Sequence, residues 1–540
     1  MRPSRSHKFG FLRVRPARCL SGALAWLAGV NLLPAQLNAQ PSTPYAAAVA
    51  LPAQAEVALV LDGASRIRTS LAGETISRAL ADSGLLAESD RAWEGLARVL
   101  GLRRDDAFDA LLGRRVILVM TGIRPGAPSQ WAVVSQVSPE IERRLRAGLG
   151  AAPRQVVGGQ PILSVENGRY ELASAVFKDA GASPLLKEDG PAEPVALMLL
   201  APAGHNALFD AMLPLIQGRA AGEPFGAMLQ PASAHGASDG LVIARLLSAD
   251  GGSDRYAAVA LHARGDTWKA GTIAWPANLW LPGIVAGPVA GVPRPVFDAL
   301  SSGALVCVVG TLGADGPPRE LIALAGTAAH LAWPDGLDAL PAGSAILTVH
   351  SGEGEPGDPF GLAVSVAVQV RDVEASAKTC DRAVARSLSA AGRDGAADFG
   401  GFLPGAIRTA EVGVGPGRTS TIAWTFQRDA QPRSPDAPRS GWWVMALGPT
   451  GKAPSCSTSI VRRTTIALTA PDGNADARRR ISLGIVRPAR AVEFVLRGAD
   501  IPSGPFALVR AIDSAEWDAW IEGDAIRAEN MVRFSPVQAR

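Results

Sequence analysis

The chain has 540 residues, of which 47% are hydrophobic and 19% charged, with 53 Lys and Arg against 50 Asp and Glu. This composition excludes a disordered protein, because the chain has enough apolar side chains to form a core. Its length is sufficient for one or two sizeable hydrophobic cores. The formal net charge of +3 suggests at first a mildly basic protein.

Residues 1–39 have the features of a secretory signal peptide. The first 18 residues contain six basic side chains and no acidic one, and a mostly apolar stretch runs from Leu20 to Pro34. That stretch is too short to span a bilayer comfortably. The segment Leu37-Asn38-Ala39 ends in a small residue, so we expect cleavage after Ala39. Without these six charges the chain has 47 basic (53 − 6) and 50 acidic groups, which argues against a nucleic-acid partner.

The sequence after the signal peptide indicates an exported protein. No apolar run there reaches the ~18 residues that a transmembrane helix needs, so we expect no transmembrane span after signal removal. The expected location is periplasmic or secreted. An exported chain that is rich in Ala, Gly and Arg and consists of strand-helix units resembles bacterial envelope proteins of unknown function, although no motif in it defines a family.

Several segments have the pattern of a strand that leads into a helix. Capping residues support three of these helices: Ser138 with Pro139, Asp372, and Asp513 with Glu516 at capping-box spacing. The last of the three carries Trp517 and Trp520 on one helical face. The five predicted units are 57–61 with a helix from about 74, 131–137 with a helix through 141–149, 195–200 with 206–217, 361–370 with 372–388, and 506–512 with a helix from 513.

Other segments have the short, β-type pattern of hairpins separated by Gly and Asp turns. The predicted hairpin strands are 241–247, 256–263, 268–275, 464–469 and 481–486. Strand pairs interspersed with strand-helix units predict an α+β protein with mainly antiparallel sheets, repeated strand-helix units and two similar-sized halves.

The stretch from Trp275 to Pro295 is rich in Pro and Gly, which is typical of a linker between domains. It divides the sequence into a signal peptide (1–39), an N-terminal α+β domain (40–275), a linker (276–295) and a C-terminal α+β domain (296–540). The segments Phe108-Asp109-Ala110-Leu111 and Phe297-Asp298-Ala299-Leu300 resemble each other. No fixed period relates such matches, so chance and duplication both remain open.

The segment Gly236-Ala237-Ser238-Asp239-Gly240 matches the G-x-S-x-G pattern of serine hydrolases, with His235 adjacent. That mechanism needs a strand before the serine and a helix after it, because the sharp turn exposes the nucleophile. Here a loop precedes the serine and a strand follows it. Ser238 and His235 are therefore weak catalytic candidates, and a polar turn entering a strand is the alternative interpretation.

The loop after the predicted strand 345–350 combines one imidazole with three carboxylates: His350, Glu353, Glu355 and Asp358. Oxygen-rich loops bind calcium, so calcium is the one cofactor that the sequence suggests. The glycines of this loop match G-x-G-x-x-G, but Glu353 and Glu355 would repel a pyrophosphate and a strand follows. The alternative is a solvated acidic loop.

Three cysteines remain after signal removal: Cys307, Cys380 and Cys456. Cys307 lies in an apolar strand and is expected to be a buried thiol, whereas Cys380 and Cys456 are able to pair in an oxidising compartment. The tryptophans suggest either core packing or carbohydrate stacking.

No motif carries a reaction, so an enzyme is less favoured than a non-catalytic protein. The sequence favours a binding or scaffolding protein for an unidentified envelope or extracellular ligand. A serine hydrolase using Ser238 and a calcium-stabilised structural protein remain the alternatives.

Overall fold

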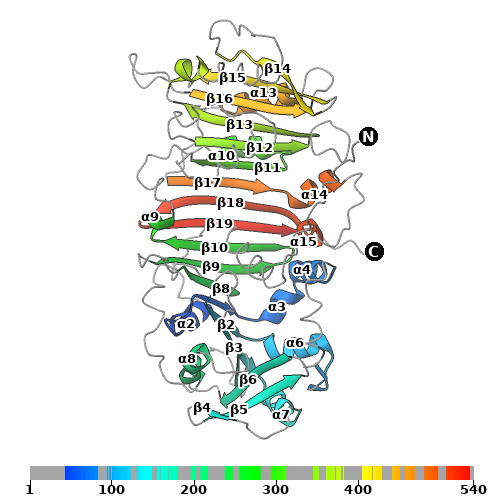
Figure 1. Cartoon of the computed structure of the whole chain (residues 1–540), viewed down its shortest axis with the longest axis vertical. Coiled ribbons are helices and arrows are strands. Elements are labelled where there is room, and N and C mark those ends of the chain that lie inside the picture. Colours follow the sequence, from blue (N-terminus) through cyan, green and yellow to red (C-terminus); the bar gives the residue numbers. More distant parts are fainter. Residues whose placement is uncertain are drawn as a thin grey trace, which may run out of the picture.

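Figure 1 shows the computed structural model of the chain. It describes the following residues: 43–82, 94, 97–98, 100–122, 130–148, 155–157, 160–167, 170–179, 196–201, 207–216, 238–246, 254–280, 294–311, 344–351, 361–370, 372–378, 381, 404–415, 418–428, 441–449, 456–468, 479–496 and 506–535.

The strands form one open sheet that extends along the whole molecule (Figure 1). Every pairing between neighbouring strands is antiparallel, and this confirms the prediction of a mainly antiparallel α+β protein. The strands are β1 (Val57–Leu61), β2 (Val116–Thr121), β3 (Gln130–Val137), β4 (Gln155–Val157), β5 (Gln160–Asn167), β6 (Tyr170–Asp179), β7 (Ala196–Ala201), β8 (Gly240–Leu246), β9 (Arg255–Arg264), β10 (Thr267–Trp275), β11 (Val306–Thr311), β12 (Ser344–Ser351), β13 (Leu362–Val370), β14 (Arg408–Gly415), β15 (Arg418–Arg428), β16 (Gly441–Pro449), β17 (Arg479–Val486), β18 (Ile512–Glu522) and β19 (Ala525–Phe534).

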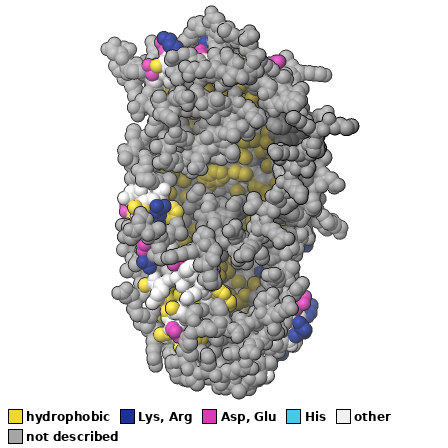
Figure 2. Space-filling view, viewed as in Figure 1, with side chains coloured by type: hydrophobic (Ala, Val, Ile, Leu, Met, Phe, Trp, Pro, Cys, Tyr) yellow, Lys and Arg dark blue, Asp and Glu magenta, His cyan; other side chains and the backbone are white. Residues whose placement is uncertain are grey.

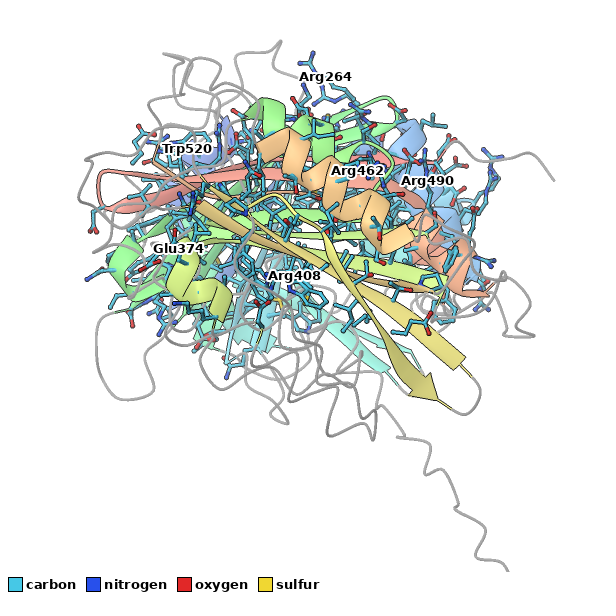
Figure 3. The ribbon with its side chains drawn as sticks, turned by 90° about the horizontal axis from the view of Figure 1, so that it is seen from above. Arg264, Glu374, Arg408, Arg462, Arg490 and Trp520 are labelled. Atoms are coloured by element: carbon cyan, nitrogen blue, oxygen red, sulfur yellow. The ribbon has the colours of Figure 1, made fainter. Side chains whose placement is uncertain are left out.

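Helices cover both faces of this sheet. The helices are α2 (Thr43–Val49), α3 (Ala64–Thr69), α4 (Leu71–Asp82), α6 (Arg104–Leu112), α7 (Pro139–Gly148), α8 (Ala207–Ile216), α9 (Ala277–Trp280), α10 (Arg294–Ser301), α13 (Cys456–Leu468), α14 (Pro488–Leu496) and α15 (Ala507–Arg510). Figure 3 looks along the long axis, with Arg462 of α13 on one side of the strands and Glu374 on the other.

The core follows from this layering. Buried side chains of α2 and α8 pack on the strands around β1, and those of α10 and α13 pack on the strands around β11. Trp424, Trp443 and Met445 form a further cluster with Val373 and Ala377. In Figure 2 hydrophobic side chains are visible in the interior of the face toward the viewer, whereas charged ones lie nearer its margins.

The pairings place the strands in the order β14-β15-β16-β13-β12-β11-β17-β18-β19, followed by β10-β9-β8-β1-β2-β3-β7-β6-β5-β4. We call β1–β3 with β5–β10 the first strand set and β11–β19 the second strand set. Each set has nine strands. When the strands are counted outward from β10 in the first set and from β19 in the second, they follow one another in the same sequence order, so that β1 matches β11 and β2 matches β12. The antiparallel pair β10–β19, called the seam below, joins the two sets.

Several predicted units are confirmed. In the first, β3 leads into α7, and the N–H of Ile141 donates to the hydroxyl of Ser138 over 3.3 Å. In the second, β13 is followed by Asp372, whose carboxylate accepts from the N–H groups of Glu374 and Ala375, both at 3.0 Å. Residues 379–380 and 382–388 of this predicted helix lie outside the described residues. These capping bonds satisfy N–H groups that a helix start leaves without a partner.

Both parts of the unit predicted at 506–512 and from Asp513 are wrong, because Ala507–Arg510 form helix α15 and residues 512–522 form strand β18. This strand pairs with β17 on one side and β19 on the other, so its backbone is bonded along both edges. The alternation of Ala515, Trp517, Ala519 and Ile521 gives one apolar face with a period of two residues. Pairing on both sides outweighs the local capping signal.

The strand predicted at 464–469 is also wrong, because α13 extends over Cys456–Leu468. Ile460, Val461 and Thr464 are buried at helical spacing, whereas Ile466 is 64% exposed. A strand would place residues 464 and 466 on the same face. The β-branched residues of this segment suggested a strand, and packing on β15 and β16 selects the helix.

The proposed domain boundaries stay a prediction, since residues 281–293 of the Pro/Gly-rich stretch lie outside the described residues. The two resembling segments belong to α6 before β2 and to α10 before β11. The equivalent of β2 by connectivity is β12 rather than β11. The resemblance therefore joins two places that are not equivalent in the fold.

Within the described residues, no helix has the length and apolar character required to cross a membrane.

Candidate functional site

The residues around Ser238 form a polar cluster where β1 ends and β8 begins. We call Asp62, Arg66, Arg115, Ser238, Asp239 and His262 the β1-end cluster. After β1 the chain turns at Gly63, whose φ of 69° favours glycine, and enters α3. The N–H of Asp62 donates to the carbonyl of Asp239 over 2.8 Å. This bond brings the start of β8 beside the end of β1.

Two ion pairs occupy the carboxylates of this cluster. The Arg115 guanidinium is 7% exposed and donates from Nη2 to Oδ2 of Asp62 over 2.9 Å. Arg66 pairs with Asp239, whose Oδ2 also accepts from the N–H of Ala263 over 3.0 Å. Charge-assisted bonds of this kind fix the carboxylates in place. Both aspartates therefore hold neighbouring backbone and side chains.

His262 lies on β9 opposite the start of β8, because Leu261 pairs with Gly240. Burial lowers the pKa of His262, and the Asp239 carboxylate raises it in part. A neutral imidazole at neutral pH is able to accept a proton, which is the property that a general base requires. Asp239 and His262 are thus electrostatically coupled.

Ser238 has its Oγ buried without a hydrogen-bond partner in the described part of the chain. No bond from this hydroxyl to an imidazole is present there, and His235 lies outside the described residues. β8 begins at Gly240, so a strand follows the serine, as the sequence indicated. A nucleophile elbow would have a helix at this point. Catalysis by Ser238 and His235 stays a prediction.

His350 lies on β12 and is 9% exposed. Burial and the charge of Arg463 lower its pKa to about 4, against a hydrogen bond with the backbone of Gly303. A neighbouring arginine disfavours a cation at this imidazole. Glu353, Glu355 and Asp358 lie outside the described residues, and no group of three or more ligand side chains occurs among the residues that are described. Calcium binding stays a prediction.

Cys307 is buried in β11, as expected, and burial raises its pKa to about 12. A thiol with this pKa is unreactive, because the nucleophile is the thiolate. Cys456 begins α13, whereas Cys380 lies outside the described residues, so the disulfide between them stays a prediction. Trp442 and Trp443 are 9% and 1% exposed, which places them in the core.

Comparisons with known proteins give no relative for this chain. No family model, no curated protein and no solved structure matches it.

The sequence interpretation missed Asp62, Arg66, Arg115 and His262 as neighbours of Ser238. Asp62 and Gly63 directly follow a predicted strand, which was the available signal for a polar turn. Arg115 directly precedes β2 and His262 lies near the end of β9, so only the pairing of β1 with β2 and β8, and of β8 with β9, brings them together.

Proposed function

We propose that the mature chain is an exported, non-catalytic binding or scaffolding protein of the bacterial envelope. The observation that supports this proposal best is the continuous antiparallel sheet through both strand sets. Rigid sheets position binding residues on the loops and edges that they carry. The proposed partner is an envelope or extracellular ligand, and the periplasm or the medium is the proposed location.

The repeated connectivity adds a feature to this proposal. We infer that the chain consists of two similar-sized halves, each with its own strand-helix units. Surfaces that occur once in each half then occur twice in the protein. A ligand with repeated units is the kind of partner that such an arrangement binds with gain in avidity.

The second candidate function is a serine hydrolase, which one observation favours. Ser238 has a buried hydroxyl without a hydrogen-bond partner among the described residues, and the coupled pair of Asp239 and His262 lies in the same cluster. Both oxygens of Asp239 already bind Arg66 and Ala263. This engagement favours the structural interpretation of the cluster.

A fluorophosphonate probe on the purified mature protein distinguishes the two functions. We expect labelling no stronger than that of the heat-denatured protein. Ser238→Ala is the test variant, and Ser420→Ala, which changes a buried serine on β15, is its matched control. Labelling that persists in Ser420→Ala and disappears in Ser238→Ala would establish the hydrolase and contradict the proposal.

A further inference from the structure

Equivalent hydrogen bonds fix β1 and β11, the first strand of each strand set in sequence order. The N–H of Glu56 donates to the carbonyl of Met120 over 2.9 Å, and that of Leu305 donates to Val349 over 2.7 Å. Each bond links the residue before β1 or β11 to the neighbouring strand, β2 or β12. Glu56 therefore corresponds to Leu305.

Two arginines extend this correspondence to the next strand. The N–H of Arg245 donates to the carbonyl of Glu56 over 2.6 Å, and that of Arg487 donates to Leu305 over 2.8 Å. Their guanidinium groups both donate to carbonyls a few residues before β1 or β11: Arg245 to Ala53 over 2.9 Å and Arg487 to Ser301 over 3.0 Å. Each arginine thus connects the end of β8 or β17 to the chain before β1 or β11.

The same correspondence can be followed to the seam. The registers of β1–β8, β8–β9 and β9–β10 lead from Glu56 to β10, and those of β11–β17, β17–β18 and β18–β19 lead from Leu305 to β19. By these registers Ala270 of β10 corresponds to Ala528 of β19. The hairpin turns then correspond as well, with glycines of positive φ at Gly265 (58°) and Gly523 (61°). An aspartate follows each glycine.

The seam pairing is two-fold symmetric in this correspondence. Ala270 faces Asn530, which is the equivalent of Thr272. Thr272 in turn faces Ala528, which is the equivalent of Ala270. Gly271 faces Glu529, which is its own equivalent. A two-fold axis therefore passes between Gly271 and Glu529, as in an interface where two copies use the same surface.

Both ends of the seam close in the same way. The N–H of Phe534 donates to the carbonyl of Asp266 over 2.9 Å, and that of Ala277 donates to Asp524 over 2.9 Å. The position equivalent to Phe534 is Pro276, which has no N–H, and the next residue donates instead. Each bond joins one strand set to the hairpin turn of the other.

Apolar contacts flank the seam and make it more than a strand ladder. Ala72 of α4 packs with Ile512 and Phe534 at one end. Ala277 of α9 packs with Ala519 and Ile526 at the other. Each strand set alone would expose these side chains together with an unpaired strand edge, which favours association.

We propose that residues 43–280 and 294–535 are two folded units that bind each other across β10 and β19, so that the chain is a covalent pseudo-dimer. The residues at the axis select the partner. Pairing of two second units would place Glu529 opposite Glu529, and like charges directly opposite destabilise a sheet. Pairing of the first unit with the second places Gly271 opposite Glu529 and avoids this repulsion.

The test uses the full-length mature chain with a specific protease site placed in 281–293. After cleavage of the folded protein, we expect both fragments to elute together with the mass of the intact chain. After dissociation by dilution, hydrogen exchange should show lost protection in β10 and β19 and retained protection in the other strands. Loss of protection throughout both fragments would overturn the proposal, as would fragments that do not stay together.

Two variants at the axis separate the seam from a general effect on stability. Gly271→Glu places a second carboxylate opposite Glu529, and Gly271→Lys changes the same glycine with the opposite charge. In the cleaved protein we expect the fragments of Gly271→Glu to dissociate about fivefold faster than those of Gly271→Lys, with the difference decreasing at high salt. Equal dissociation rates for the two variants would contradict the pairing of Gly271 with Glu529.

Discussion

At the scale of single residues, burial decides the chemistry of His350 and Cys307. Both lie in neighbouring strands under α10 and α13, and both have a pKa shifted toward the neutral form. Neutral side chains at these positions avoid the cost of a charge in the core. A thiol that stays protonated is a poor nucleophile, so Cys307 is unreactive in the fold.

This burial makes the stability of the protein depend on pH. The pKa of His350 is about 4 in the fold, against about 6.5 in the unfolded chain. The unfolded state therefore binds the proton first, so stability is full above pH 6.5 and is lost as the pH falls toward 4. The expected loss is on the order of 3 kcal/mol.

Urea unfolding between pH 4 and pH 7 measures this effect. His350→Gln removes the titrating group, so its stability should change less over this range than that of the wild type. If the stability of the wild type and of His350→Gln had the same pH dependence, His350 would not contribute to the loss of stability at low pH.

The sequence predicted the place of some structural and candidate functional residues and missed that of others. The burial of Cys307 follows from the apolar residues on either side of it, and capping by Ser138 and Asp372 follows from local spacing. The β1-end cluster did not follow, because Asp62, Arg115 and His262 come from three strands that meet only through pairing. The Gly-Asp turns at 265–266 and 523–524 are a sequence feature that the two strand sets share.

At the scale of elements, the wrong predictions at 456–468 and 506–522 have one cause. Local signals in 456–468 and 512–522 favour the opposite structure from the one that tertiary packing selects. β18 has a partner strand on both sides, and α13 packs on the sheet with Ile460 and Val461. The predictions of β3 and α7 are correct, because there the local pattern and the tertiary packing favour the same structure.

A matched pair of isoleucines tests the helical assignment of α13. Ile460 is 1% exposed and Ile466 is 64% exposed. Ile460→Ala should reduce the free energy of unfolding by about 2–5 kcal/mol, and Ile466→Ala should change it by less than about 0.5 kcal/mol. Comparable losses in the two variants, measured by urea unfolding, would contradict the helix.

At the scale of the whole molecule, the class of fold was predictable and its continuity was not. Alternating strands and short turns indicate an antiparallel α+β protein. The seam joins strands that lie about half of the sequence apart, and no local pattern reports such a pairing. The symmetry of the seam became visible only through the registers of β9, β10, β18 and β19.

Cross-strand disulfides in the full-length chain test the two-fold seam most directly. The pairs Lys269→Cys with Met531→Cys and Ile273→Cys with Arg527→Cys face each other in the ladder and are exchanged by the two-fold axis. Antiparallel partners have Cα separations within the range of a disulfide. We predict that both pairs form on oxidation, as measured by mass spectrometry of the linked peptides, whereas Lys269→Cys with Arg527→Cys, four residues out of register, does not. Disulfide formation by the out-of-register pair, or by neither of the two symmetric pairs, would contradict the seam.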